Sequence, residues 1–235
     1  MEVQFIDYIK KNNLFDNSHN LLLAYSAGVD SSVLFNLLLN CKYKFSVAHC
    51  NYKLRGQHSD NDQRFIIEKA KIHKVKYHTR EFDISKINFK KSQSVQMKCR
   101  QIRYKWFNEL SKKYGYDFIL TAHHLNDSIE TFFINIFRGT GIEGLTGIPI
   151  KRDKFIRPLL FATKNSILEY AKKNGVHYRE DKSNESKNYK RNKIRSDLIP
   201  IISVISENYE EIFYKSFKNL KNCLLYTSDA ADEPR

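Results

Sequence analysis

Residues 21–32 read LLLAYSAGVDSS, and the apolar run VLFNLLL follows at once at 33–39. A polar loop of small residues with one carboxylate therefore lies between two apolar segments. The first segment is too short for a lone helix and indicates a buried strand. The second places four apolar side chains on one helical stripe, with Ser31 or Ser32 near its start as a cap: Val33, Leu34, Leu37 and Leu38. The stretch predicts a strand, a tight turn and a helix.

The rest of the chain repeats this alternation. The helix at 59–74 opens with Ser59 and Asp62 in capping-box spacing, and Gly115 closes a long amphipathic helix. Further strands are expected at 43–50, 75–83, 117–122 and 154–160, and further helices at 94–115, 125–137 and 163–175. Repeated strand–helix units predict an α/β fold with a mainly parallel sheet flanked by helices. A helical segment is expected from residue 189 onward.

Composition describes an ordinary globular chain with a strong positive charge. Its 235 residues carry a net charge of +14 and a pI near 9.5, which suits a nucleic-acid partner; a compositional preference for Lys, Asn and Ile is the alternative. Four cysteines without a C-x-x-C pair argue against a zinc ribbon or an iron–sulfur site. No apolar run approaches about 18 residues and the N-terminus lacks a signal-peptide layout, so we expect a cytoplasmic protein without a membrane span.

The loop at 26–32 has the composition of an anion site. Small residues between a strand and a helix N-terminus present several backbone N–H groups to one point, next to the positive end of the helix dipole. Asp30 would repel phosphates unless a divalent cation lay between them, so the loop suggests a Mg²⁺–nucleotide with Ser26, Ser31 and Ser32 as hydroxyl donors. It is not a Walker A loop. The alternative is an ordinary turn in which Asp30 and Ser31 only cap the helix.

Three polar clusters each follow a predicted strand: SAGVDS, HCNYKLRGQ at 49–57 and HHLNDSIE at 123–130. In parallel sheets ligands bind beyond the carboxyl ends of the strands. We therefore expect the three clusters to converge on one crevice.

These motifs carry a resemblance to a known family. SAGVDSS resembles the SGGxDS loop of the PP-loop ATP pyrophosphatases. Four further stretches resemble tRNA(Ile)-lysidine synthase in type, order and spacing over about residues 18–200: HCNYKLRG at 49–56, TAHHLNDSIETFFINIFRGTGIEGLTGIP at 121–149, RPLL at 157–160 and REDKSNESKNYKRNKIR at 179–195. The resemblance implies a Rossmann-like, adenine nucleotide α-hydrolase-like catalytic domain over 1–200. It also implies a helical linker at 201–222, leading towards a missing C-terminal tRNA-binding region; the acidic, Lys-free residues 223–235 look like a non-native tail.

The resemblance also implies a reaction. Such enzymes are ATP-dependent ligases that use ATP and Mg²⁺ to adenylate C2 of cytidine 34 in the CAU anticodon of tRNA(Ile). The ε-amine of free L-lysine then displaces AMP and forms lysidine, and pyrophosphate is the other product. The expected partners are tRNA(Ile) and L-lysine, and a homodimer is left open.

Site residues follow by carrying the motifs over. Asp30 is expected to be catalytic and to meet Mg²⁺ through the phosphates. The expected ATP-binding residues are His49 and the seven residues of the loop: Ser26, Ala27, Gly28, Val29, Asp30, Ser31 and Ser32. Asp127 and Glu130 lie three apart on one helical face and are expected to recognise lysine, with Asp127 also catalytic; the alternative is a helix cap. His123, His124 and Asp127 also have a spacing that permits metal ligation.

The remaining assignments are arginines and one asparagine. Arg103 is the expected catalytic contact to the adenylate phosphate, because QIRYKWF resembles the family's Arg-Tyr helix, although Arg100 is an alternative and a solvated face would explain both. The tRNA contacts are expected at four residues of the two basic motifs: Arg55, Arg191, Asn192 and Arg195.

Two residues depart from the family pattern. Ala27 stands where the loop usually has Gly, which would cost about 1–2 kcal/mol if that residue needs a left-handed backbone. Tyr52 stands where a second His is common. Two rival functions remain at this stage: another PP-loop enzyme, such as a tRNA thiolase or an amidotransferase-type synthetase, and a noncatalytic tRNA-binding module in which Ala27 has disabled the loop.

Overall fold

The computed structural model describes residues 1–86, 94–179 and 190–231, with the backbone alone at the last residues of that range. The chain divides into two compact units. The first contains Met1–Ala122, Lys151–Pro158 and the segment from Ile167; the second contains His123–Ile150, Leu159–Ser166 and the described residues from 190 onward.

A six-stranded sheet forms the centre of the first unit, in the order β3-β2-β1-β4-β6-β5. Every pairing is parallel except the short antiparallel pair β5–β6, which confirms the predicted mainly parallel sheet. The strands are β1 Leu21–Ala24, β2 Phe45–Asn51, β3 Lys76–Glu81, β4 Phe118–Leu120, β5 Lys151–Arg152 and β6 Phe155–Ile156.

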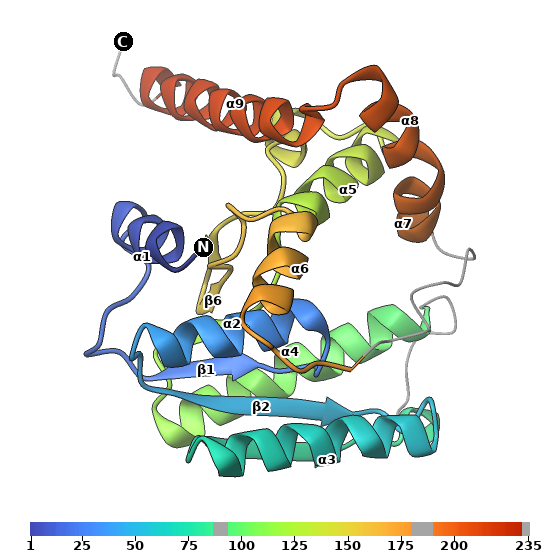
Figure 1. The fold of residues 1–235 in the computed structure, drawn as a ribbon. Coiled ribbons are helices and arrows are strands. Elements are labelled where there is room, and N and C mark those ends of the chain that lie inside the picture. Colours follow the sequence, from blue (N-terminus) through green and yellow to red (C-terminus); the bar gives the residue numbers. More distant parts are fainter. Residues whose placement is uncertain (87–93, 180–189, 232–235) are drawn as a thin grey trace. The chain divides into compact units, whose positions relative to one another are not determined.

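Helices cover both faces of this sheet (Figure 1). Right-handed crossovers from β1 to β2 and from β2 to β3 place α2 Val29–Asn40 and α3 Gln57–Ile72 on one face, whereas the return from β3 to β4 places α4 Val95–Tyr114 on the other. A core cluster joins α4 to the sheet through Leu22, Ala48 and Trp106. The first unit also contains α1 Glu2–Lys11, which was not predicted, and a 3₁₀ turn Ile84–Lys86. Helix α6 Lys164–Lys173 begins in the second unit and continues into the first.

The predicted cap at the end of α4 is confirmed, and the predicted caps of α2 and α3 are wrong. Gly115 ends α4 in the left-handed region, as predicted, and Ser94 caps the other end by accepting the N–H of Met97 at 3.3 Å, which was not predicted. The predicted serine cap of α2 is wrong, because the helix begins at Val29 with Gly28 as its N-cap. The predicted capping box of α3 is also wrong, because that helix begins two residues earlier and buries Ser59 and Asp62.

The second unit is helical apart from its loops. A core of Leu125, Ile129 and Phe217 is surrounded by further aromatic side chains, among them Phe132 and Phe213. Its helices are α5 Leu125–Ile136, the 3₁₀ turn η2 Ile142–Leu145, α7 Lys190–Lys193, the π turn Ile194–Leu198, α8 Ile199–Ile205 and α9 Tyr209–Ala231. The expected helical segment is confirmed, and the domain boundaries at 200 and 222 stay predictions.

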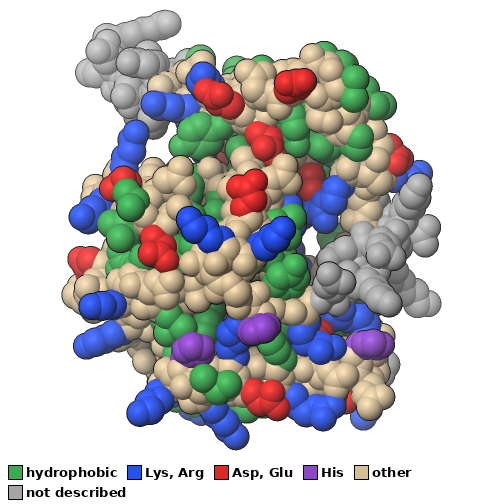
Figure 2. Space-filling view, in the orientation of Figure 1, with side chains coloured by type: hydrophobic (Ala, Val, Ile, Leu, Met, Phe, Trp, Pro, Cys, Tyr) green, Lys and Arg blue, Asp and Glu red, His purple; other side chains and the backbone are tan. Residues whose placement is uncertain are grey.

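Charge is spread widely over the described surface. Figure 2 shows Lys and Arg side chains distributed over the visible face, with acidic side chains between them. Among the described helices, none combines the length and apolar character that a membrane span requires. The net charge of +14 therefore does not by itself locate a binding surface.

Candidate functional site

Ala27 is the residue that turns the chain from β1 into α2. Its φ is +68°, in the left-handed region, and its side chain is fully buried. Gly28 has φ −67°, a conformation open to any residue. The carbonyl of Ala27 accepts the N–H of Arg179 at 2.9 Å. The strained position in this loop is therefore occupied by alanine, at a cost of about 1–2 kcal/mol.

The three loop serines have different roles in this geometry. The hydroxyl of Ser31 donates to the Gly28 carbonyl at 3.0 Å and lies 3.1 Å from that of Ser26. The hydroxyl of Ser32 lies 3.3 Å from the Ala27 carbonyl and 3.2 Å from the Tyr25 hydroxyl. Ser31 and Ser32 are buried, whereas Ser26 is exposed. Ser31 and Ser32 thus hold the loop together, and Ser26 is the hydroxyl that faces solvent.

Asp30 lies in the first turn of α2, where a helix has N–H groups without intrahelical partners. The loop therefore offers backbone N–H groups, a serine hydroxyl and one half-buried carboxylate at a single helix N-terminus. Oxygen donors with only one carboxylate suit Mg²⁺ that is held mainly by nucleotide phosphates. Within the described ranges, no group of three or more His, Cys, Asp or Glu side chains is arranged to hold a metal, so the alternative metal set of His123, His124 and Asp127 is not such a group.

His49 lies at the end of β2, directly beside the start of the loop. Its Nδ1 donates to the Tyr25 carbonyl at 2.9 Å, and Nε2 has no hydrogen-bond partner among the described residues. The side chain is 7% exposed. Burial lowers the pKa of His49, against the hydrogen bond to Tyr25. The ring is therefore neutral near pH 7, and Nε2 is a buried acceptor next to the predicted nucleotide loop.

A buried carboxylate, which was predicted only as part of a helix cap, connects three segments near the loop. Asp62 accepts Arg55 Nη2 at 2.8 Å and Arg179 Nε at 2.6 Å. Its side chain is 11% exposed and each arginine is 35% exposed. Arg55 was expected to contact tRNA; here part of its guanidinium is engaged by Asp62. Because Arg179 also donates its N–H to Ala27, this cluster fixes the back of the loop.

The two candidate arginines of α4 point to different neighbours. The guanidinium of Arg100 lies 4.7 Å from the centre of the Tyr104 ring. The charge of Arg103 acts on Cys50, at the carboxyl end of β2, where burial raises the thiol pKa to about 12 and Arg103 opposes that rise. Tyr52, which departs from the family pattern, donates its hydroxyl to the Cys99 carbonyl at 2.9 Å. Arg103 is therefore close enough to Cys50 for its charge to act on that thiol.

In the second unit, Asp127 is an ionised carboxylate at the start of α5. It accepts the His124 N–H at 3.0 Å and lies 3.6 Å from His124 Nε2. Burial opposes ionisation, but the nearby charges of His124, His123 and Arg191 outweigh it and lower the pKa of Asp127. The side chain remains 15% exposed. Asp127 thus both caps α5 and presents a negative charge.

Glu130 differs sharply from Asp127 although it lies one turn away. It is 2% exposed, and its two oxygens lie 2.9 Å from Arg191 Nε and 2.7 Å from Arg195 Nε. Burial raises the pKa of Glu130, and Arg195 opposes the rise. Arg191 also donates to the Thr131 hydroxyl at 3.0 Å. The predicted lysine pair is therefore one accessible carboxylate and one carboxylate enclosed by two arginines.

The polar clusters after β1 and β2 meet in the first unit, where His49 contacts Tyr25. The third cluster begins at His123, in the second unit, so the single crevice stays a prediction. Asn192 is half-buried on α7, between Arg191 and Arg195 in sequence. Arg191 and Arg195 could be singled out from sequence as basic residues, but their shared partner Glu130 could not.

The family model of the PP-loop domain matches residues 1–202. The chain belongs to the PP-loop family. Curated relatives agree with the motif resemblance: a tRNA(Ile)-lysidine synthase of Bacteroides thetaiotaomicron is 33% identical over 235 residues, which is 100% of this chain and 55% of the relative. One from Porphyromonas gingivalis is 35% identical, with 96% of this chain and 50% of the relative covered, and one from Chlorobaculum tepidum is 37% identical, with 86% and 62% covered. This PP-loop chain spans about half the length of the first of these curated relatives.

Solved structures show the same fold at low identity. A U34-tRNA thiolase from Methanococcus maripaludis superposes with a TM-score of 0.76 at 18% identity, covering 93% of this chain and 78% of the thiolase. An NH3-dependent NAD synthetase from Campylobacter jejuni gives a TM-score of 0.52 at 14% identity, covering 100% and 96%. These similarities confirm the PP-loop fold and say nothing of the substrate.

Proposed function

We propose that this PP-loop chain carries the catalytic part of a tRNA(Ile)-lysidine synthase. ATP would adenylate C2 of cytidine 34 in the CAU anticodon, and free L-lysine would displace AMP to give lysidine. The observation that carries the proposal is the match of curated lysidine synthases across the chain, at 33% identity over all 235 residues for one of them. The geometry of the site supports the assignment as follows.

The first unit supplies the nucleotide site. The N-terminus of α2 faces the phosphates with its N–H groups, Ser26 adds an exposed hydroxyl, and Ala27, Gly28 and Val29 provide the turn. Mg²⁺ at Asp30, when bound, would neutralise charge on the phosphates and on the departing pyrophosphate. His49 Nε2 is a fixed acceptor because Nδ1–H is committed to Tyr25. It suits a ribose hydroxyl or the adenine amino group.

The second unit supplies the lysine contact. The lowered pKa of Asp127 keeps its carboxylate ionised, so it is suited to hold a cationic amine and poorly suited to take a proton from it. Because Glu130 is enclosed by Arg191 and Arg195, we assign it the indirect role of fixing those guanidinium groups. Their side chains are 38% and 47% exposed, which leaves surface for tRNA phosphates. Asn192 and Arg55 are the other proposed tRNA contacts, and Arg103 is the proposed contact to the adenylate phosphate.

The test of this proposal is AMP formation from Mg²⁺–ATP in the presence of free L-lysine and a tRNA(Ile) transcript with a CAU anticodon, because AMP is released only when lysine displaces it. AMP should appear only when the wobble base is C, because that base is the adenylated group. Asp30→Asn should reduce the rate about a hundredfold or more, a loss of the size seen when one electrostatic contact to developing charge is removed. Asp7→Asn, an exposed carboxylate on α1, is the matched control and should leave the rate unchanged.

The rival assignments predict other results. A noncatalytic tRNA-binding module would bind the transcript without forming AMP. An ammonia-using synthetase would form AMP without tRNA. Either outcome would contradict the proposal.

A further inference from the structure

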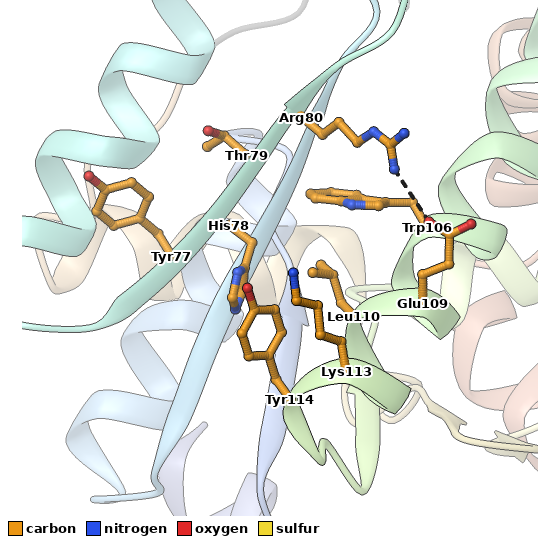
Figure 3. Close-up of a pocket in the computed structure, with 9 residues that line it drawn as sticks. All are labelled: Tyr77, His78, Thr79, Arg80, Trp106, Glu109, Leu110, Lys113 and Tyr114. Carbon is orange, nitrogen blue, oxygen red and sulfur yellow. Dashed lines mark hydrogen bonds and ion pairs between the residues drawn. The ribbon is translucent and has the colours of Figure 1, made fainter.

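A pocket of about 490 Å³ lies in the first unit between β3 and the second half of α4. In Figure 3, Arg80 from β3 and Lys113 from α4 border this β3–α4 pocket, Trp106 and Leu110 lie between them, and Tyr77 points away. None of its lining residues belongs to the nucleotide loop or to the other predicted site residues. The lining residues are Tyr77, His78, Thr79, Arg80, Trp106, Glu109, Leu110, Lys113 and Tyr114.

The pocket has a cationic rim. Lys76 Nζ lies 4.5 Å and Lys113 Nζ 5.4 Å from the centre of the Tyr114 ring. In the part of the chain that the structure describes, neither lysine has a carboxylate within ion-pair distance. Arg80 lies 3.3 Å from Glu109, and both side chains are about half exposed. Two ammonium groups are therefore available for an anion, and the single carboxylate of the lining is already paired.

The pocket also offers an aromatic surface. Tyr114 is 41% exposed, and its ring packs against His78 at 4.6 Å between centroids. Burial, followed by the charges of Lys76 and Lys113, lowers the pKa of His78, and its Nε2 lies 2.8 Å from the Tyr116 hydroxyl. The imidazole is therefore a neutral packing partner that holds the Tyr114 ring in place. Exposed aromatic rings beside cations are what proteins use to bind unpaired RNA bases and their phosphates.

The surrounding helix extends this surface towards the proposed active site. Helix α4 carries six Lys or Arg residues and one carboxylate, Glu109. Arg103, the proposed adenylate contact, and Lys113 lie ten residues apart on it, which is about 15 Å along an α-helix. An RNA strand that reaches Arg103 can therefore also reach the pocket.

We propose that the β3–α4 pocket binds a phosphate and an adjacent unpaired base of the substrate RNA, outside the nucleotide that reacts. Lys76 and Lys113 move from the Tyr114 ring to the phosphate, and the base takes their place against that ring. The identification of this RNA as tRNA(Ile) rests on the proposed function. The ability of the pocket to bind a phosphate and a base is argued from its own residues and does not depend on that function. The competing explanation is protection of a sheet edge, because β3 is the outermost strand of the sheet and charged side chains on such strands prevent edge-to-edge aggregation.

The test is the affinity of the 235-residue chain for a tRNA(Ile) transcript at several salt concentrations. The pair Lys76→Gln and Lys113→Gln should weaken binding and reduce the slope of log Kd against log salt concentration by about 1, since the contacts to one phosphate are lost. Lys10→Gln with Lys71→Gln is the matched control, because it removes the same charge from exposed sites on α1 and α3.

A second pair of variants tests the stacking role. Tyr114→Leu should weaken RNA binding about fivefold or more, the effect expected for one lost base–aromatic stack, whereas Tyr77→Leu, on the other side of β3, should not. Titration with AMP distinguishes RNA from a free nucleotide. The inference is overturned if the Lys76 and Lys113 variant matches the Lys10 and Lys71 control in Kd and salt slope, if it only aggregates more readily, or if it loses AMP affinity while keeping RNA affinity.

The outcome is separable from that of the proposed function. If the unmodified chain forms lysidine and the pocket variant binds RNA normally, the pocket inference fails alone. If the pocket variant weakens RNA binding and no lysidine forms, the pocket inference stands and the proposed function fails. If the unmodified chain binds no RNA, both fail.

Discussion

Ala27 combines a left-handed backbone with a fully buried methyl group. Its neighbours hold it in this conformation through the Arg179 N–H and the Ser32 hydroxyl, which both reach its carbonyl. The loop therefore adopts its tight turn with alanine at this position. This geometry argues against the alternative in which Ala27 disables the loop, because alanine in place of glycine lowers the stability of the chain and leaves the shape of the turn intact.

We expect Ala27→Gly to be better tolerated than Ala48→Gly. Both variants remove one buried methyl group and add chain entropy to the unfolded state. Only the first also relieves left-handed strain, so its free energy of unfolding should exceed that of the second by about 1–2 kcal/mol. Urea denaturation of both variants measures the difference. Equal losses would show that Ala27 is not strained.

His49 should make the stability depend on pH. Its folded pKa is lowered by burial below the ordinary value of 6.5. The unfolded chain therefore takes up a proton as the pH falls through about 6.5 while the folded chain does not, and stability is lost below that pH and not above it. His49→Asn keeps a donor for the Tyr25 carbonyl and should lose less stability between pH 7.5 and 5.5 than the unmodified chain, with a difference of at most about 1.4 kcal/mol per pH unit. An unchanged pH profile would contradict a neutral, buried His49.

Variants of Asp127 and Glu130 should differ in their effects on the KM values for lysine and tRNA. Asp127→Asn should raise the KM for lysine about tenfold or more, since a hydrogen bond to a charged group contributes about 1.5–3 kcal/mol, with little change in the KM for ATP. Glu130→Gln should also raise the lysine requirement and in addition raise the KM for tRNA, because it releases Arg191 and Arg195. Glu143→Gln, an exposed carboxylate of the same unit, is the control. Unchanged lysine dependence in both variants would refute the assignment.

The positions of residues on turns and helices could be predicted where the signal is local. The loop at 26–32 and the pair at 127 and 130 are contiguous motifs, so spacing alone places them on a turn and a helix face. The role of Asp62 was missed because its partner Arg179 is 117 residues away in sequence. The enclosure of Glu130 was missed for the same reason, since Arg195 is 65 residues away. Contacts of this kind need the tertiary structure.

At the scale of elements, α4 illustrates what sequence does determine. The helix lies within the predicted range 94–115 and ends at the predicted Gly115, whereas the role of Ser94 as its N-cap was not predicted although it is equally local. The start of α3 was misplaced because Gly56 turns the chain with φ +50° and opens the helix at Gln57. Ser59 then lies within the first turns and accepts the Arg55 N–H. A capping-box pattern inside a helix is thus indistinguishable from one at its start.

The segment after α6 is expected to support nucleotide binding. His177 accepts Lys69 Nζ through its carbonyl at 3.0 Å, and Arg179 pairs with Asp62 while contacting Ala27. Arg179→Gln should raise the KM for ATP about two- to fivefold, the range for a partly exposed ion pair, and leave the rate at saturating ATP unchanged. Arg179→Lys should restore part of the loss, and Arg64→Gln, an exposed arginine of α3, should have no effect. A lower rate with an unchanged KM would contradict this positioning role.

At the scale of the whole molecule, the parallel sheet follows from the repeated strand–helix pattern, whereas the antiparallel pair β5–β6 does not. Those two strands have two residues each, too few for a periodic signal. The charge of +14 predicts a polyanionic partner in general terms. The proposal that this partner is a tRNA rests on the match to curated lysidine synthases.

The central claim is the transfer of lysine to cytidine 34. The most direct measurement is the incorporation of labelled L-lysine into a tRNA(Ile) transcript with a CAU anticodon, in Mg²⁺–ATP, beside a transcript in which the wobble C is replaced by U. We expect label in the first transcript and none in the second. Label in both, or in neither while AMP forms, would contradict lysidine synthesis by this chain.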